Sequence, residues 1–214
     1  MSEDRHQENL EFLEEKRQQF PDEGEIQLLY ATTLLEFRSD EEVASETAKA
    51  VELAPDDPVI LVQAGSLMLG IGHVEDARSY VERARNLAGP DFVLEDGLTN
   101  LEGLLASFEE KYDLAEEKLR LAIALDPTFD TFVRNLVRLL ASRGRYEEAV
   151  EVIDQALPRV ERKTFLNECA MDSESSPDQW ESRERAASGG KGDSRTARCE
   201  GRVAELNRRA GQEG

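Results

Sequence analysis

Few residues in this chain have the types and spacing that catalysis or metal binding would need. His6 and His73 lie far apart in the sequence, and neither has a cysteine or a second histidine at ligand spacing. No Ser or Cys lies in a nucleophile motif, and the "GIGH" stretch is too short for a phosphate-binding loop. Carboxylate pairs such as Glu41–Glu42 open predicted helices, where they stabilise the positive end of the helix dipole. We therefore expect a chain that is not an enzyme and uses no metal ion or cofactor.

One pair of arginines has the arrangement of a binding site. Arg134 and Arg138 are four residues apart with Asn135 beside them, so they share one face of a predicted helix. Guanidinium groups form bidentate hydrogen bonds with carboxylate or phosphate that lysine cannot match. The pair is either a solvated surface feature, neutralised in part by acids such as Glu102, or an anion site. An anion site would hold an acidic side chain or terminal carboxylate of a partner, with amide contacts from Asn100 and Asn135.

A repeated spacing of small residues predicts the helices that position this pair. Ala77 and Ala84 are seven residues apart, on one helical face, and a Gly-Pro break follows them. Equivalent stretches recur, and their first positions are 34, 38 and 34 residues apart: Val43, Ala77, Ala115 and Ala149. Another stretch with helical periodicity precedes each of them. Each unit is therefore predicted to form two short helices, joined by a turn and closed by Pro or Gly-Pro.

This pattern resembles the tetratricopeptide repeat family, whose unit is a helix–turn–helix of about 34 residues. Four units in register cover residues 24–158. The small positions of the family are matched by Gly65, Gly103, Ala77, Ala115, Ala149, Ala50, Ala84, Ala122 and Ala156. Its second-helix aromatic is matched by Tyr112 and Tyr146, and its closing proline by Pro55 and Pro127. The large first-helix aromatic of the family is absent, and its position holds Gln27, Leu61, Thr99 and Val133.

The resemblance implies an all-α fold: a right-handed superhelical α-solenoid of tetratricopeptide-like helix–turn–helix repeats. Its helices cross closely, which explains the small residues. We expect an N-terminal capping helix (a half repeat) in residues 1–23, four repeats in 24–158, a short C-terminal cap in 159–170 and a disordered tail in 171–214. The tail is rich in Gly, Ser and charge, so it buries too little apolar surface to offset the entropy of ordering.

The third repeat contains four extra residues, because Gly65 and Gly103 are 38 residues apart. Four residues make about one helical turn. We therefore expect the first helix of this repeat to begin one turn early, either as a simple elongation at the rim or as a lip on a binding groove.

The composition disfavours several classes of partner. The net charge is −20, from 46 acidic and 26 basic residues, so we expect no nucleic-acid partner, which would need Lys and Arg to neutralise phosphates. No apolar run approaches the roughly 18 residues of a membrane span, so no membrane partner is expected. The polar N-terminus is unlike a signal peptide. Cys169 and Cys199 lie outside the repeats, so no disulfide framework is indicated, and these features together favour a cytoplasmic protein.

The resemblance also implies a binding function, because first helices of the family line a concave groove that grips partner peptides. By register, the groove residues here are Thr32, Gln63, Ser66, Asn100, Leu104, Arg134, Asn135 and Arg138. Leu28 and Thr32 stand where chaperone-docking members carry Lys and Asn, so that carboxylate clamp is not expected. Our leading hypothesis is a non-catalytic adaptor or scaffold that binds a partner peptide. The alternatives are a structural or self-associating module, with its groove filled by its own tail or a second copy, and a regulatory subunit of a separate enzyme.

Overall fold

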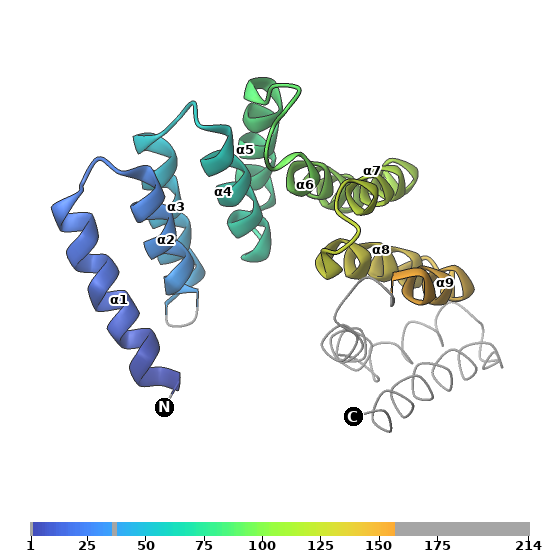
Figure 1. Cartoon of the computed structure of the whole chain (residues 1–214), viewed down its shortest axis with the longest axis horizontal. Helices are drawn as coiled ribbons and strands as arrows, with labels where there is room; N and C mark the ends of the chain where they lie inside the picture. Colours follow the sequence, from blue (N-terminus) through green and yellow to red (C-terminus); the bar gives the residue numbers. More distant parts are fainter. Residues whose placement is uncertain (1, 36–37, 157–214) are drawn as a thin grey trace. The chain divides into compact units, whose positions relative to one another are not determined.

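The computed structural model of the chain describes residues 2–35 and 38–156, and their side chains from Gln7 onward (Figure 1). Every regular element in these residues is a helix, which confirms the predicted all-α class. The helices are α1 (Ser2–Gln19), α2 (Gly24–Leu34), α3 (Asp40–Leu53), α4 (Pro58–Gly70), α5 (Val74–Leu87), α6 (Glu95–Phe108), α7 (Tyr112–Leu125), α8 (Asp130–Ser142) and α9 (Tyr146–Ala156). The expected cap at 159–170 and tail at 171–214 lie outside the described residues.

The chain divides into two compact units, Met1–Glu109 and Glu110–Gly214, which we call unit 1 and unit 2. In unit 1, α2 packs against α3 and α4 packs against α5, while α1 lies against α2 (Figure 1). The first helices α2, α4 and α6 also contact one another in sequence order. In unit 2, α8 packs against both α7 and α9.

The small residues that define the repeat lie at the helix crossings. Ala77 and Ala84 of α5 are fully buried, as are Ala115 and Ala122 of α7. A Cβ atom added at Gly65 of α4 would lie 3.0 Å from Cγ2 of Val81 on α5, which is tight enough that the Val81 side chain would have to shift. Because protein interiors are close-packed, these positions set how near paired helices approach.

Local sequence signals explain where several helices begin. Ser39 caps α3: its hydroxyl accepts a hydrogen bond from the Glu42 amide at 3.3 Å, and the Glu42 carboxylate accepts one from the Ser39 amide at 3.4 Å. Asp57 caps α4 by accepting from the amides of Val59 and Ile60, with Pro58 in the first turn. These caps satisfy amides that have no partner within the helix.

The expectation that the first helix of the third repeat begins one turn early is wrong. Helix α6 begins eight residues before Gly103, and α4 begins seven residues before Gly65, so the helix itself gains only one residue. The other extra residues lie in the connection 88–94, which replaces the shorter connection 54–57 of the preceding repeat. Gly89 and Pro90 account for this, because glycine disfavours helix and proline restricts the residue before it to extended backbone.

Candidate functional site

The eight groove residues predicted from the sequence are divided between the two units. Five of them lie on α2, α4 and α6 of unit 1, and three lie on α8 of unit 2. We call the exposed sides of these helices the first-helix faces, and describe the face of each unit separately.

The first-helix face of unit 1 carries small polar side chains at two predicted positions of α4 and one of α2. Gln63 and Ser66 are exposed and three residues apart, so they lie on the same side of α4. Thr32 occupies the position on α2 that Ser66 occupies on α4, and it is also exposed. The Thr32 hydroxyl donates a hydrogen bond to the Leu28 carbonyl at 2.9 Å, which leaves its oxygen able to accept one from a ligand. These groups can bind the peptide backbone of a partner.

Helix α6 contributes less to this face than its sequence predicted. Asn100 is only 6% exposed, and Leu104 is half-buried. Glu102, which the sequence offers as a counter-charge for the arginine pair, accepts a hydrogen bond from Nε of Arg85 on α5 at 2.6 Å. Arg85 also binds Glu95 at 2.8 Å. The charged side chains of α6 therefore take part in holding α6 on α5.

In unit 2, α8 places the arginine pair one helical turn apart. Arg138 is exposed, while Arg134 is half-buried and donates from Nη2 to the Thr131 hydroxyl at 3.1 Å. Asn135 is 8% exposed and therefore presents little surface to a ligand. Of the three predicted residues, Arg138 and the partly accessible Arg134 can reach a bound anion most directly.

Sequence reasoning missed one prominent residue of the unit 1 face. Leu29 of α2 is 55% exposed, although it is a large aliphatic side chain. It lies one repeat, or 34 residues, before Gln63, and this register could have identified it. Leu35, at the end of α2, is 45% exposed. Exposed leucines on one helix are an apolar surface available to a partner.

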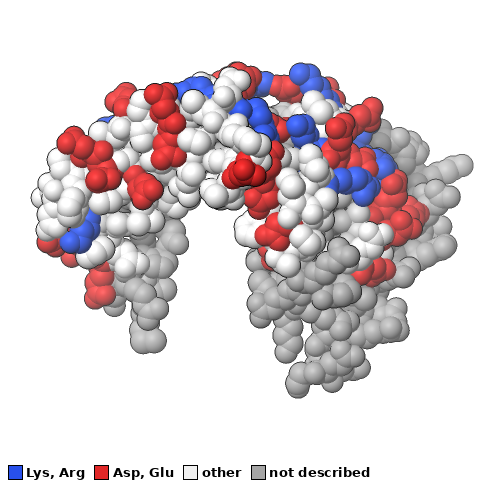
Figure 2. Space-filling view, turned by 45° about the horizontal axis from the view of Figure 1, so that its top comes forward, with Lys and Arg blue, Asp and Glu red and all other residues white. Residues whose placement is uncertain are grey.

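The two faces also differ in charge. Helix α2 carries one charged residue, Glu25, and α4 carries none. Helix α8 carries Arg134 and Arg138 together with Asp130 at its first position. Elsewhere on the visible surface, acidic and basic side chains are scattered among uncharged ones (Figure 2). Helices α2 and α4, with one charged residue between them, therefore contrast with a chain in which 34% of the residues are charged.

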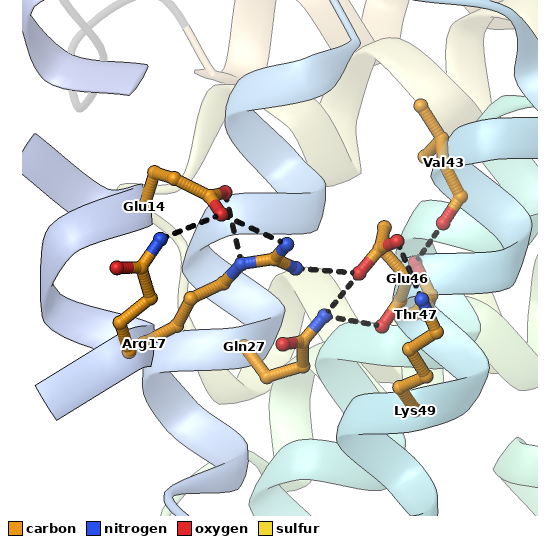
Figure 3. Close-up of polar contacts among 8 residues, drawn as sticks. Glu14, Arg17, Gln27, Val43, Glu46, Thr47 and Lys49 are labelled. Carbon is orange, nitrogen blue, oxygen red and sulfur yellow. Dashed lines mark hydrogen bonds and ion pairs between the residues drawn. The ribbon is translucent and has the colours of Figure 1, made fainter. Parts of the chain in front are cut away.

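A polar cluster joins α1 to α2 and α3 in unit 1 (Figure 3). The guanidinium of Arg17 binds Glu14 on α1 at 3.0 Å and Glu46 on α3 at 2.8 Å, and it lies 4.0 Å from the ring centre of Tyr30 on α2. Gln27 of α2, which is buried, donates to the same Glu46 carboxylate at 2.6 Å. The cluster therefore ties three helices together at the N-terminal end of the unit.

The same contacts set the protonation of the acidic members of this cluster. Burial alone would raise the pKa of Glu46, but hydrogen bonds from Lys49 and Gln27 and the positive charges of Lys49 and Arg17 outweigh burial and lower it. For Glu14, burial is likewise outweighed by hydrogen bonds from Arg17 and Gln18 and by the charge of Arg17, so its pKa is also lowered. Both carboxylates are ionised near neutral pH, which suits a structural role.

In the part of the chain that the structure describes, no three His, Cys, Asp or Glu side chains come together in a way that could hold a metal ion. Among the same residues, no helix combines the length and apolar character needed to cross a membrane.

The comparisons with known proteins agree with the helix pairs. Residues 109–162, which include α7, α8 and α9, match the family model described as tetratricopeptide repeat. The crystal structure of PilW, a widely conserved type IV pilus biogenesis factor, matches with a TM-score of 0.66 and 17% identity, over 92% of each chain. Residues 109–162 thus match the tetratricopeptide repeat family, and the likeness to PilW shows that the chain has the same helical-repeat fold.

Other solved structures place the chain in the same solenoid fold. TTC0263, a thermophilic protein of this family from Thermus thermophilus, matches with a TM-score of 0.59 and 23% identity, over 74% of this chain and 84% of its own. YrrB, a family protein with an unusual peptide-binding site, matches with a TM-score of 0.50 and 17% identity, over 69% and 74% respectively. No curated protein sequence matches the chain. These likenesses show the fold.

Proposed function

We propose that this chain is a non-catalytic adaptor or scaffold of the cytoplasm that binds peptide segments of partner proteins on its first-helix faces. In unit 2, Arg134 and Arg138 bind an acidic side chain or the terminal carboxylate of a partner peptide. The exposed Thr32, Gln63 and Ser66 of unit 1 hydrogen-bond with the peptide backbone. The cytoplasmic location rests on the two cysteines, which lie outside the repeats, and on the acidic composition.

The observation that carries this proposal is the arginine pair on α8. Two guanidinium groups on one side of a helix provide a planar, charge-assisted site for a carboxylate. Arg138 is exposed, and Arg134 is half-buried and donates a hydrogen bond to Thr131 at 3.1 Å. In a chain with a net charge of −20, two arginines on one side of a first helix stand out as a candidate contact for an acidic ligand.

The test uses the full chain as bait for a displayed library of random short peptides. Affinities of the selected peptides are then measured by fluorescence anisotropy for the wild type and for Arg134→Glu with Arg138→Glu. The double reversal should weaken binding at least tenfold, or about 1.4 kcal/mol. Its melting temperature should stay near that of the wild type, because neither residue belongs to the small-residue core.

A matched control reverses two basic residues of a second helix, Lys118→Glu with Arg120→Glu on α7. This control has the same net charge as the double reversal, so it should bind the selected peptides as the wild type does. If both variants bound the peptides equally weakly, the effect would be due to overall charge, and the proposed arginine site would be wrong. A library that yields no saturable binder would refute peptide binding itself.

A further inference from the structure

The first-helix face of unit 1 has a chemistry that the carboxylate site of α8 does not explain. Helices α2 and α4 contain neither Lys nor Arg, and their one charged residue is Glu25 at the start of α2. Glu25, Leu29 and Thr32 are spaced at four and three residues, so they follow one side of α2. All three are exposed. This side of unit 1 is thus an apolar and hydroxyl-bearing surface with a single negative charge at one end.

We propose that this face binds an apolar, acid-free segment of the partner protein, with a Lys or Arg of that segment next to Glu25. The face is defined by Leu29, Thr32, Leu35, Gln63 and Ser66. This inference rests on the proposed function, because it names the chemistry of the peptide that the adaptor holds.

Burial of apolar area favours an apolar occupant. Leu29 and Leu35 are large aliphatic side chains of which about half remains accessible. Covering them with aliphatic or aromatic side chains removes apolar surface from water, which is the main favourable term in most protein association. An acidic side chain in the same place would lose hydration without gaining a counter-charge, because α2 and α4 contain neither Lys nor Arg. The surface around the leucines therefore favours apolar groups and disfavours acidic ones.

Charge complementarity decides which charge the segment carries at its end. Glu25 repels an acidic residue and attracts a basic one, and neither α2 nor α4 provides a positive charge to offset the repulsion. Gln63 and Ser66 on α4 add an amide and a hydroxyl, which can satisfy the backbone groups of an extended segment. An apolar segment with one basic residue is the occupant that satisfies all of these groups.

A second copy of the chain fits this face less well. Symmetric pairing of the face with itself would cover the leucines, but it would bring two Glu25 carboxylates and no basic residue of α2 or α4 to the interface. Like charges that meet at an interface are destabilising. The charge pattern therefore favours a partner of different sequence.

The experiment uses the peptides selected from the random library with the full chain. We expect them to contain an apolar stretch without Asp or Glu, and we expect Leu29→Ser with Leu35→Ser to weaken their binding at least tenfold. The matched control, Leu53→Ser with Leu87→Ser, removes leucines of similar exposure, 38% and 43%, from the ends of the second helices α3 and α5. This control should bind as the wild type does, and both variants should keep the wild-type melting temperature.

Charge is tested by repeating the selection with Glu25→Lys. The peptides selected by this variant should lose the basic residue and admit acidic ones, whereas Glu52→Lys on α3 should select the wild-type pattern. An unchanged pattern with Glu25→Lys would overturn the charge assignment.

The outcomes separate this inference from the proposed function. If the affinity of the selected peptides depended on Arg134 and Arg138 but not on the two leucines, the proposal of an apolar segment would be wrong. The proposed adaptor function would not be affected. Failure to select any peptide would overturn both. Light scattering tests whether a second copy occupies the face. If the wild type were a dimer and the variant Leu29→Ser with Leu35→Ser were a monomer, the face would be a dimer interface, and this result would also contradict the inference.

Discussion

The first helices of the two units occupy equivalent positions in the repeat but present different chemistry. In unit 1, α2 and α4 expose leucine, hydroxyl and amide groups and carry one charge between them. In unit 2, α8 presents two arginines from positions that hold Leu28 and Thr32 in the first repeat. The backbone is the same in both, so the repeat determines only where side chains point. Binding chemistry must be argued from the individual side chains at those positions.

The two units resemble each other where the helices pack. Ala77 at the α4–α5 crossing and Ala115 on α7 are both fully buried. The exposed side chains of the first helices thus vary between the units, whereas the positions that maintain helix spacing are kept small. This difference between packing and binding positions can be tested by mutation.

The largest effect is expected from overpacking these crossings. Ala77→Leu and Ala115→Leu should each destabilise the chain by about 1–3 kcal/mol, because the added methyl groups must displace a neighbouring helix. Ala124→Leu on α7 is the control, since Ala124 is exposed. Urea unfolding followed by circular dichroism measures the loss. If the two buried substitutions were as mild as the control, the packing described for the two units would be incorrect.

Much of this packing could be predicted from the sequence. The helix pairs follow from the recurrence of small residues at Ala77, Ala115 and their equivalents, because close crossings tolerate few residue types. The start of α6 was not predicted, since the spacing gives the number of extra residues but not their location. The Gly89-Pro90 pair was the local signal that places them in the connection.

The candidate site was less predictable than the fold. Thr32 and Ser66 are exposed, as a binding position requires, but the register did not indicate that Asn100 and Asn135 are buried. Exposure depends on how closely a neighbouring helix approaches, and the periodicity of one helix contains no such information. For the same reason, the exposure of Leu29 could not be recognised from its residue type, which is typical of a core position.

A smaller effect is expected from the polar cluster that distinguishes the N-terminal end of unit 1. Arg17→Met should cost about 1–2 kcal/mol, because Glu46 and Glu14 lose a charged hydrogen-bond partner. This cost is smaller than that of breaking a fully buried ion pair, because the Arg17 side chain is 26% exposed and partly solvated. Hydrogen exchange should show the loss of protection concentrated in α1. Lys16→Met, on the same helix, should change protection little. An equal loss of protection in both variants would show that Arg17 does not specifically hold α1 in place.

The pH dependence of this loss follows from the carboxylates. The pKa values of Glu14 and Glu46 are below the ordinary value of 4.5 in the folded chain, so their contribution is fully present above pH 4.5. It is lost as the pH falls below 4.5 through their folded-state values. The stability difference between the wild type and Arg17→Met should therefore shrink over that acidic range.

The smallest change in stability is expected from the turns between paired helices. The turn at Glu110 is compared with the turns at Gly72 and Gly144. The backbone at Gly72 and Gly144 has φ of 82° and 74°, in the left-handed region that glycine adopts without strain. Glu110 stands at the equivalent position with φ of 60°, where a Cβ atom is unfavourable. Glu110→Gly should therefore stabilise the chain by about 0.5–1 kcal/mol, since relief of the strain exceeds the added entropy of the unfolded glycine.

The reverse changes, Gly72→Ala and Gly144→Ala, should each cost about 1 kcal/mol through the backbone alone, because an added Cβ meets no atom within 4 Å at either position. Chemical unfolding of the three variants measures all of these changes, and a Glu110→Gly variant less stable than the wild type would show that the Glu110 side chain contributes more than its backbone strain costs.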